Sequence, residues 1–336
     1  MYTKLTDVKL KTGENMEIGV VVAPDQEYSD SVAKVLHHKG ELWLSHVNRA
    51  LSGDIKELET RFYIGKLDGQ VVANIMTVEY NHTGVFGHVF TIPEQRRKHI
   101  CSLIMEQQMS DFRRRGGGIL ILGTGFNSAP YWIYHSFGFR SIIENTGFMR
   151  YSTDDNFEVK HFTPSKDTKA VDVQWKHWSV MNVLMSVDEV ELMKSVSSGL
   201  YGKINFEGGF LHFIKRIEDG NLKARLLESE SGAVVGCITL DRDHRWAGNT
   251  YILDMFMHKN FAPHYDTLLN SMQLPDHVPL CNGRTEGKIQ CYVAENSLDE
   301  KIKALQKSGF EQEAMLKKQF SYGSESYNVF LYSKFI

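Results

Sequence analysis

Apolar runs separated by glycine, proline and polar turns predict alternating strands and helices in the first half of the chain. Residues 17–23 form a first apolar run, and residues 29–51 carry apolar side chains at helical spacing. Two more runs, 61–67 and 70–78, flank Asp68-Gly69. Asp-Gly favours a two-residue hairpin turn, because both central residues of that turn need a positive φ. The pattern therefore predicts a strand, a helical segment and a hairpin.

The next apolar run, residues 85–92, stops at Pro93 and is followed by a basic turn. A helix is predicted from about Cys101 to Arg115, since cations in a last turn followed by glycines are a typical helix end. The remaining elements of this unit are a strand at 118–122, a helix around Tyr134, and short strands at 139–143 and 148–152. Together they predict a mixed α/β unit.

The same order of elements recurs after a polar segment, 156–169, which we interpret as a linker. Runs at 223–228 and 233–240 flank Ser231-Gly232, as the earlier pair flanks Asp68-Gly69. The run 251–257 corresponds to the strand before Pro93, and 288–293 is another apolar strand. The segment Lys307–Phe310 corresponds to His135–Phe139. This order predicts an internal duplication of one α/β unit, with domains at 1–160 and 161–336.

Composition narrows the class of protein. A chain of 336 residues is long for one core, which agrees with two domains. The net charge of −3 gives no reason to expect a nucleic-acid partner. No apolar run reaches the roughly 18 residues of a membrane span, and the N-terminus is too polar for a signal peptide. The four cysteines, Cys101, Cys237, Cys281 and Cys291, lack CxxC spacing and indicate free thiols. We expect a cytoplasmic protein without a membrane partner.

Two segments carry candidate chemistry. The first, Arg96-Arg97-Lys98-His99-Ile100-Cys101, places cations and helix-opening backbone amides where an anion would be stabilised. The second runs from Asn127 to Phe139 and has Tyr134 four residues before Gly138. Together these segments resemble the acyl-CoA-binding core of the GNAT superfamily of N-acetyltransferases, over about residues 60–150.

The resemblance implies two tandem GNAT-like domains, each a twisted mixed sheet with helices on both faces, and acetyl-CoA as co-substrate. It implies that the backbone of Val89 and Thr91 orients the thioester, that Asn127 contacts the cofactor, and that Tyr134 is the general acid. The residues implied to hold the pyrophosphate are Arg96, Arg97, Lys98, His99, Ile100, Cys101 and Ser102. His99 and Cys101 depart from the family pattern, which has small residues at both positions.

Each of these residues also has a simpler structural interpretation. The basic turn is then a solvated surface turn, Tyr134 a core aromatic residue, and Asn127 a helix N-cap. Glu79 and His88 are candidates for a general base, since they lie on the two strands that face the acceptor in the resembled family. Both are also ordinary residues for such strands.

The second copy departs further from the family pattern. Ala262 stands where the first copy has Arg96, and Leu305 stands where it has Tyr134. Leucine cannot donate a proton, so this copy is interpreted as a scaffold, a substrate wall or a dimerisation surface. We expect no metal site, because no HExxH motif occurs and the histidines 37, 38, 258 and 264 lack a set of partner ligands.

The predicted function is transfer of an acetyl or short acyl group from CoA to an amine, by direct attack. The acceptor, a small molecule or a peptide, stays open because a fold does not name a substrate. Two alternatives also stay open: an acyl-CoA-binding sensor without turnover, and an aminoacyl- or peptide-ligating enzyme with tandem GNAT domains.

Overall fold

The computed structural model describes residues 1–246, 250–274 and 287–336, so Cys281 lies outside the described residues. The chain divides into two compact units. The first unit comprises Met1–Phe157, Gln174–Val183 and Glu207–His212, and the second comprises Glu158–Val173, Leu184–Phe206 and Phe213–Ile336. Each unit is assembled from three stretches of chain, and the predicted division between residues 160 and 161 stays a prediction.

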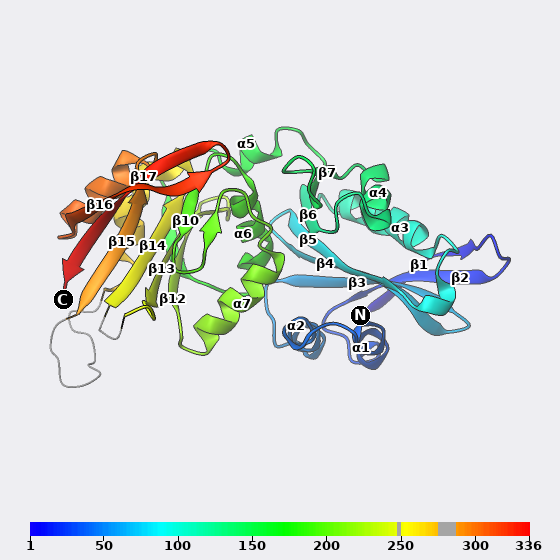
Figure 1. Cartoon of the computed structure of the whole chain (residues 1–336). Coiled ribbons are helices and arrows are strands. Elements are labelled where there is room, and N and C mark those ends of the chain that lie inside the picture. The colour runs from blue at the N-terminus through cyan, green and yellow to red at the C-terminus, as the bar shows by residue number, and fades with distance from the viewer. Residues whose placement is uncertain (247–249, 275–286) are drawn as a thin grey trace. The chain divides into compact units, whose positions relative to one another are not determined.

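The first unit is built on an eight-stranded sheet (Figure 1). Its strands, in spatial order, are β1 (Tyr2–Lys9), β2 (Asn15–Val22), β3 (Glu59–Leu67), β4 (Gln70–Tyr80), β5 (Thr83–Thr91), β6 (Ile119–Gly123), β8 (Phe148–Ser152) and β7 (Arg140–Ser141). Neighbouring strands are antiparallel except β5 and β6, which are parallel. The predicted hairpin is confirmed: Leu67 pairs with Gln70, and both Asp68 and Gly69 have positive φ.

Helices cover both faces of this sheet (Figure 1). One face carries α1 (Ser29–Leu36) and α2 (Glu41–Ser52), and the other carries α3 (Ile100–Arg114) and α4 (Ala129–Ser136). The predicted helical segment 29–51 is therefore two helices: the first ends at Leu36, and the second begins after Gly40, whose extended backbone forms its N-cap. On the α3 side, a core of buried side chains from β2, β3, β4 and the two helices holds the layers together.

The second unit has a seven-stranded sheet with the order β16-β17-β15-β14-β13-β12-β9. Its strands are β9 (Thr168–Asp172), β12 (Lys223–Ser229), β13 (Val234–Arg242), β14 (Thr250–Met257), β15 (Lys288–Ala294), β16 (Glu311–Tyr322) and β17 (Glu325–Phe335). A separate hairpin joins β10 (Met193–Ser195) and β11 (Leu200–Tyr201). The helical segments after β14 and β15 are η2 (Lys259–His264), α8 (Tyr265–Asn270) and α9 (Asp299–Lys307).

The two sheets repeat one topology. In each, a hairpin is followed by a strand, a helical crossover and a parallel strand, and the parallel pairing covers only the first three residues of the strand. Thr83–Val85 pair with Ile119–Ile121 in the first unit, and Thr250–Ile252 pair with Lys288–Gln290 in the second. The predicted fold class, two mixed sheets with helices on their faces, is confirmed, and the shared strand order supports the predicted duplication.

Three stretches differ from expectation. Residues 2–9, which carry no strong apolar pattern, form the edge strand β1 because they pair with β2. The predicted linker 156–169 instead contains helix α5 (Phe157–His161) and the start of β9. Helices α6 (His177–Ser186) and α7 (Glu207–Glu218) each contribute residues to both units. None of the helices among the described residues is long and apolar enough to span a membrane.

Candidate active site

The central feature of the first unit is the point where strands β5 and β6 separate. Their parallel pairing ends at Val85 and Ile121, while β5 continues to Thr91 and β6 to Gly123. Beyond Val85, the backbone of β5 on this side is therefore no longer paired with β6. Unpaired strand backbone in a sheet interior offers hydrogen-bonding groups to a ligand.

A bulge in β5 lies just beyond the point where the two strands separate. Met76 pairs with Gly87 and Asn74 pairs with Phe90, so two residues, His88 and Val89, stand opposite one residue of β4. His88 has a φ of 50°, and the buried Asn74 donates from Nδ2 to the His88 carbonyl at 3.1 Å. A bulge of this kind bends a strand and redirects its side chains, and such bulges are common beside active sites.

Sequence reasoning did not single out Asn74, although the sequence holds a signal for it. It is the one amide side chain in the otherwise apolar run from Val71 to Met76. A buried amide in such a run needs a hydrogen-bond partner. The partner it finds is the bulged backbone.

The turn after Pro93 leads directly into an uncapped helix start. Helix α3 begins at Ile100, and its first turn receives no side-chain cap. The amides at the start of a helix have no partner inside the helix. They border a cavity of about 470 Å³ lined by Thr91, Gln95, Arg96, Arg97, His99, Ile100, Cys101, Ser102 and Ile133. Seven of the predicted cofactor-binding residues are thus brought together around one cavity.

The cations of this turn divide into two groups. Arg96 and Arg97 are exposed, and Arg96 donates from Nε to the Thr91 carbonyl at 3.0 Å while its guanidinium lies over the Phe90 ring. Lys98 instead forms an ion pair with Glu14 at 2.5 Å. The side chain of Lys98 is therefore directed to the β1–β2 hairpin, and what this residue offers near the cavity is backbone.

The two departures from the family pattern are accommodated differently. His99 has a φ of 63°, a conformation that glycine adopts at no steric cost, and its Nε2 lies 3.5 Å from Lys11 Nζ. Cys101 lines the cavity, and burial raises the pKa of its thiol to about 11. Cys101 is thus a small neutral side chain, and the backbone at His99 keeps the conformation that a glycine would have.

Tyr134 lies on α4 in the core beside the separated strands. Its ring contacts Phe86 edge-on, with centroids 5.5 Å apart, and only 7% of the residue is exposed. Burial, together with the nearby Cys101 and Glu207, raises the pKa of the Tyr134 phenol above its usual value. The raised pKa keeps the phenol protonated, and nothing within the described part of the chain hydrogen-bonds to its hydroxyl.

Asn127 lies in the loop before α4. Its Oδ1 accepts from Trp132 Nε1 at 2.9 Å, and its φ is 58°. The N-cap of α4 is Ser128, whose Oγ accepts from the Tyr131 amide at 3.3 Å. The alternative interpretation of Asn127 as the N-cap is therefore wrong, and its contact with a cofactor stays a prediction.

The two candidate bases occupy contrasting environments. Both carboxylate oxygens of Glu79 are held by Arg115, at 2.7 and 2.9 Å, and one also accepts from Thr77. His88 is buried, and burial, with Lys39 and His38 nearby, lowers the pKa of its imidazole to about 3. Its Nε2 has no hydrogen-bond partner within the described part of the chain. Glu79 is thus committed to an ion pair, and His88 is a neutral, weakly basic side chain.

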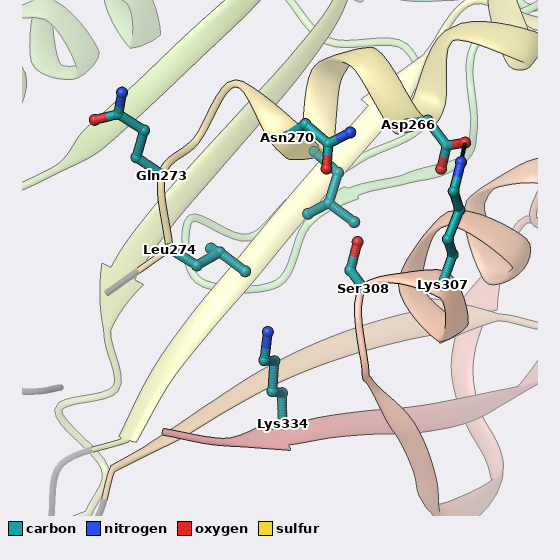
Figure 2. A pocket seen from close by; sticks show the side chains of 8 residues that line it. Asp266, Asn270, Gln273, Leu274, Lys307, Ser308 and Lys334 are labelled. Atoms are coloured by element: carbon teal, nitrogen blue, oxygen red, sulfur yellow. Dashed lines mark hydrogen bonds and ion pairs between the residues drawn. The ribbon is translucent and has the colours of Figure 1, made fainter. Parts of the chain in front are cut away.

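The corresponding positions of the second unit lack this chemistry. Ala262 and Leu305 are both buried apolar residues. The Asp266 and Lys307 side chains that border a separate pocket of about 330 Å³ form an ion pair at 2.6 Å (Figure 2). His258 stacks on Phe162, and His264 contacts Thr168. No group of three or more His, Cys, Asp or Glu residues is placed to hold a metal among residues 1–246, 250–274 and 287–336.

Solved structures of N-acetyltransferases match about half of the chain. A mutant form of the spermidine/spermine N-acetyltransferase of Vibrio cholerae is 13% identical with a TM-score of 0.38, covering 51% of this chain and 95% of its own. A putative acetyltransferase from Salmonella typhimurium, solved with its cofactor acetyl-CoA, is 8% identical with a TM-score of 0.39, covering 50% and 92%. A GNAT-family acetyltransferase from Bacillus anthracis is 15% identical with a TM-score of 0.34, covering 51% and 95%. No protein-family model and no curated protein matches the sequence.

Proposed function

We propose that the first unit transfers an acetyl group, or another short acyl group, from CoA to an amine. The observation that carries this proposal is that two features line one cavity and a third lies beside it, since Tyr134 follows the lining residue Ile133 and is close to the lining residue Cys101. The three features are the unpaired part of β5 up to Thr91, the uncapped start of α3 at Ile100, and the free hydroxyl of Tyr134. An acyl transfer needs an anion site, an oriented carbonyl and a proton for the leaving group, and these features match those needs.

The chain's own groups fit the phosphates of CoA. Backbone amides at a helix start favour anions, and the exposed Arg96 and Arg97 add positive charge beside them. Cys101 leaves space at the cavity wall because its side chain is small. The positive φ of His99 keeps the turn open in the conformation that the resembled family achieves with glycine.

Acetyl-CoA, when bound, supplies the activated thioester. In the proposal, the backbone amides of Val89 and Thr91, beyond the end of the pairing with β6, orient the thioester carbonyl by hydrogen bonds. Tyr134 then donates its phenolic proton to the sulfur as the carbon–sulfur bond breaks. Its raised pKa keeps the phenol protonated at neutral pH, so Tyr134 can donate a hydrogen bond to the departing sulfur while the negative charge develops there.

The two candidate bases differ in their suitability for the acceptor. The ion pair with Arg115 leaves Glu79 no free oxygen, so we leave Glu79 out of the proposed mechanism. His88 lies at the bulge with an unbonded Nε2, which suits it to accept a hydrogen bond from the incoming amine. An imidazole with a pKa of about 3 is a weak base, so we propose that His88 orients the amine and that solvent removes its proton.

Calorimetric titration with acetyl-CoA, run beside a thiol-release assay with a panel of primary amines, tests the proposal. Binding of acetyl-CoA together with amine-dependent thiol release is the expected result. Binding without release for every amine would favour the sensor alternative. Absence of binding to any CoA ester would overturn both. Binding of tRNA that weakens steeply with added salt would instead favour the aminoacyl-ligating alternative.

A further inference from the structure

We infer that Glu207, which lies far along the chain at the start of helix α7, binds the ammonium group of the acceptor amine in the first unit. This inference rests on the proposed acyl transfer and adds to it the residue that recognises the acceptor, and the acceptor's charge. Glu207 belongs to the stretch Glu207–His212, which is part of the first unit although the preceding residues, 184–206, belong to the second.

The position of the carboxylate is set by the glycine beneath it. A methyl group added to Gly87 would lie 2.7 Å from Glu207 Oε1, so the carboxylate rests directly against the backbone of β5. Gly87 comes two residues after the end of the β5–β6 pairing and one residue before the bulged His88. Glu207 therefore lies at the point where the two strands separate.

The carboxylate and the cofactor cavity approach this point from opposite faces of the sheet. The Phe86 side chain packs against Tyr134 in the core on the α3 and α4 side. Successive residues of a strand point to opposite faces, so Gly87 faces the α1 and α2 side. Because β5 and β6 are not paired here, an ammonium held by Glu207 can lose a proton to solvent and then, as the neutral amine, meet a thioester held on the other face. The effect of the Glu207 charge on the pKa of Tyr134 agrees with this proximity.

Glu207 is held firmly in place. The Trp178 indole, which is fully buried, donates from Nε1 to the Glu207 carbonyl at 3.0 Å. The next residue, Gly208, packs against the Trp43 ring, to which an added methyl would lie 3.4 Å away. The backbone at the start of α7 is therefore fixed, so the Glu207 side chain extends toward β5 from a defined position.

The surroundings indicate the kind of acceptor. The rings of Trp43 and His88 meet edge to face at 4.8 Å, and His38 stacks on Phe90 at 4.1 Å. Trp43 also packs against Gly208, the residue after Glu207, so this end of α7 lies beside an aromatic ring, and such surroundings favour an organic cation with an apolar chain. The Glu207 carboxylate also affects Lys39. Burial lowers the pKa of the Lys39 ammonium, and the negative charge of Glu207 raises it in part. The charge of Glu207 thus favours the charged form of a nearby alkylammonium, and an acceptor of the same chemistry, a primary alkylammonium, fits the site.

The experiment compares the wild type with Glu207→Gln, Gly87→Ala and the control Glu218→Gln, which alters an exposed glutamate at the other end of α7. Thiol release is measured with benzylamine and butylamine, which are cationic near neutral pH, and with hydroxylamine, which is not. Acetyl-CoA affinity is measured by calorimetry for each variant.

We expect Glu207→Gln to raise KM for both cationic amines by about 10- to 100-fold, as loss of a charged hydrogen bond implies. Acetyl-CoA affinity and the rate with hydroxylamine should stay close to the wild type. Gly87→Ala should raise KM for the cationic amines because its methyl displaces the carboxylate, and Glu218→Gln should match the wild type.

Two results would overturn the assignment while leaving the proposed acyl transfer intact. One is an unchanged KM for the cationic amines in Glu207→Gln. The other is an equal loss with hydroxylamine and with benzylamine, which would show a merely structural role. A wild type that binds acetyl-CoA but releases no thiol with any of the three amines would overturn the transferase and the assignment together.

Discussion

At the scale of single residues, the proposed chemistry depends on buried groups whose neighbours determine their protonation. Tyr134 and Tyr131 lie on the same short helix and are equally buried, yet they differ in one respect. The Tyr131 hydroxyl lies 3.1 Å from Ser141 Oγ, whereas that of Tyr134 has no partner in the described chain. Tyr131 thus uses its hydroxyl within the protein, whereas the hydroxyl of Tyr134 is available to a ligand.

Replacing Tyr134 by Phe should therefore lower kcat while leaving acetyl-CoA affinity unchanged. Loss of a general acid costs about 100-fold or more in rate. Steady-state kinetics with a responsive amine and calorimetry with acetyl-CoA provide the measurement. Tyr131→Phe is the matched control and should keep nearly full activity. Full activity in Tyr134→Phe would remove this residue from the mechanism.

Buried histidines should make the protein sensitive to acid. Burial, with smaller effects of His88 and Arg49, lowers the pKa of His46 to about 3, and His88 is lowered to a similar value. Between pH 3 and the ordinary histidine pKa of 6.5, the unfolded chain binds more protons than the folded one. Stability is therefore full above pH 6.5 and falls as the pH drops, by up to about 1.4 kcal/mol per pH unit for each group.

Urea unfolding between pH 4 and 7 checks this expectation. His46→Phe should make the acid decline shallower by nearly one proton. Thr60→Val removes the hydroxyl 3.4 Å from His46 Nε2 but keeps the titrating ring, so its pH slope should match that of the wild type. An unchanged slope in His46→Phe would show that this ring does not contribute.

At the scale of elements, the start of α3 depends on backbone conformation rather than on side-chain type. Arg97 and His99 both have positive φ, and the helix begins at the next residue, Ile100. This conformation lets the chain turn from β5 into the helix and leaves the first amides uncapped. An L-residue pays a steric cost there that glycine does not.

The pair His99→Gly and His99→Ala isolates that cost. Both variants lose the imidazole and its contact with Lys11, but only glycine relieves the positive φ. We expect His99→Gly to be more stable than His99→Ala by about 1 kcal/mol in chemical denaturation. Acetyl-CoA affinity should be retained in His99→Gly. Equal stability of the two variants would contradict a strained backbone at this position.

At the scale of the whole molecule, the first unit depends on residues that lie beyond its contiguous stretch. Trp178 and Phe210 belong to the first unit, are fully buried, and stack with centroids 6.0 Å apart. Trp178 also meets His46 of α2 edge-on at 4.7 Å. The aromatic core under α2 is thus completed by two later stretches of the chain.

A fragment of residues 1–160 should therefore be less stable than a fragment of residues 1–212, which keeps both stretches. Losing a large buried aromatic side chain costs about 3–5 kcal/mol, and the shorter fragment loses more than one. Urea unfolding and binding of a hydrophobic dye to the two fragments provide the measurement. Equal stability of the fragments would show that the first unit does not need the later stretches.

Local signals in the sequence determined much of the fold. The Asp68-Gly69 hairpin, the strand that stops at Pro93 and the helix that ends before three glycines follow from turn chemistry and short-range periodicity. The same signals, repeated later in the chain, led to the duplicated topology. Most residues around the proposed cofactor cavity, those between Thr91 and Ser102, were found for the same reason: they are close in sequence and belong to one turn.

Only the tertiary structure decided the features that depend on contacts between distant segments. Strand β1 exists because β2 pairs with it, and the bulge at His88 exists because two residues of β5 stand opposite one of β4. Glu207 reaches Gly87 because α7 contributes its first residues to the first unit, although no periodicity connects these two residues, which are 120 positions apart in the sequence. Sequence pattern reports which face of an element is apolar, whereas only packing decides which distant side chain covers it.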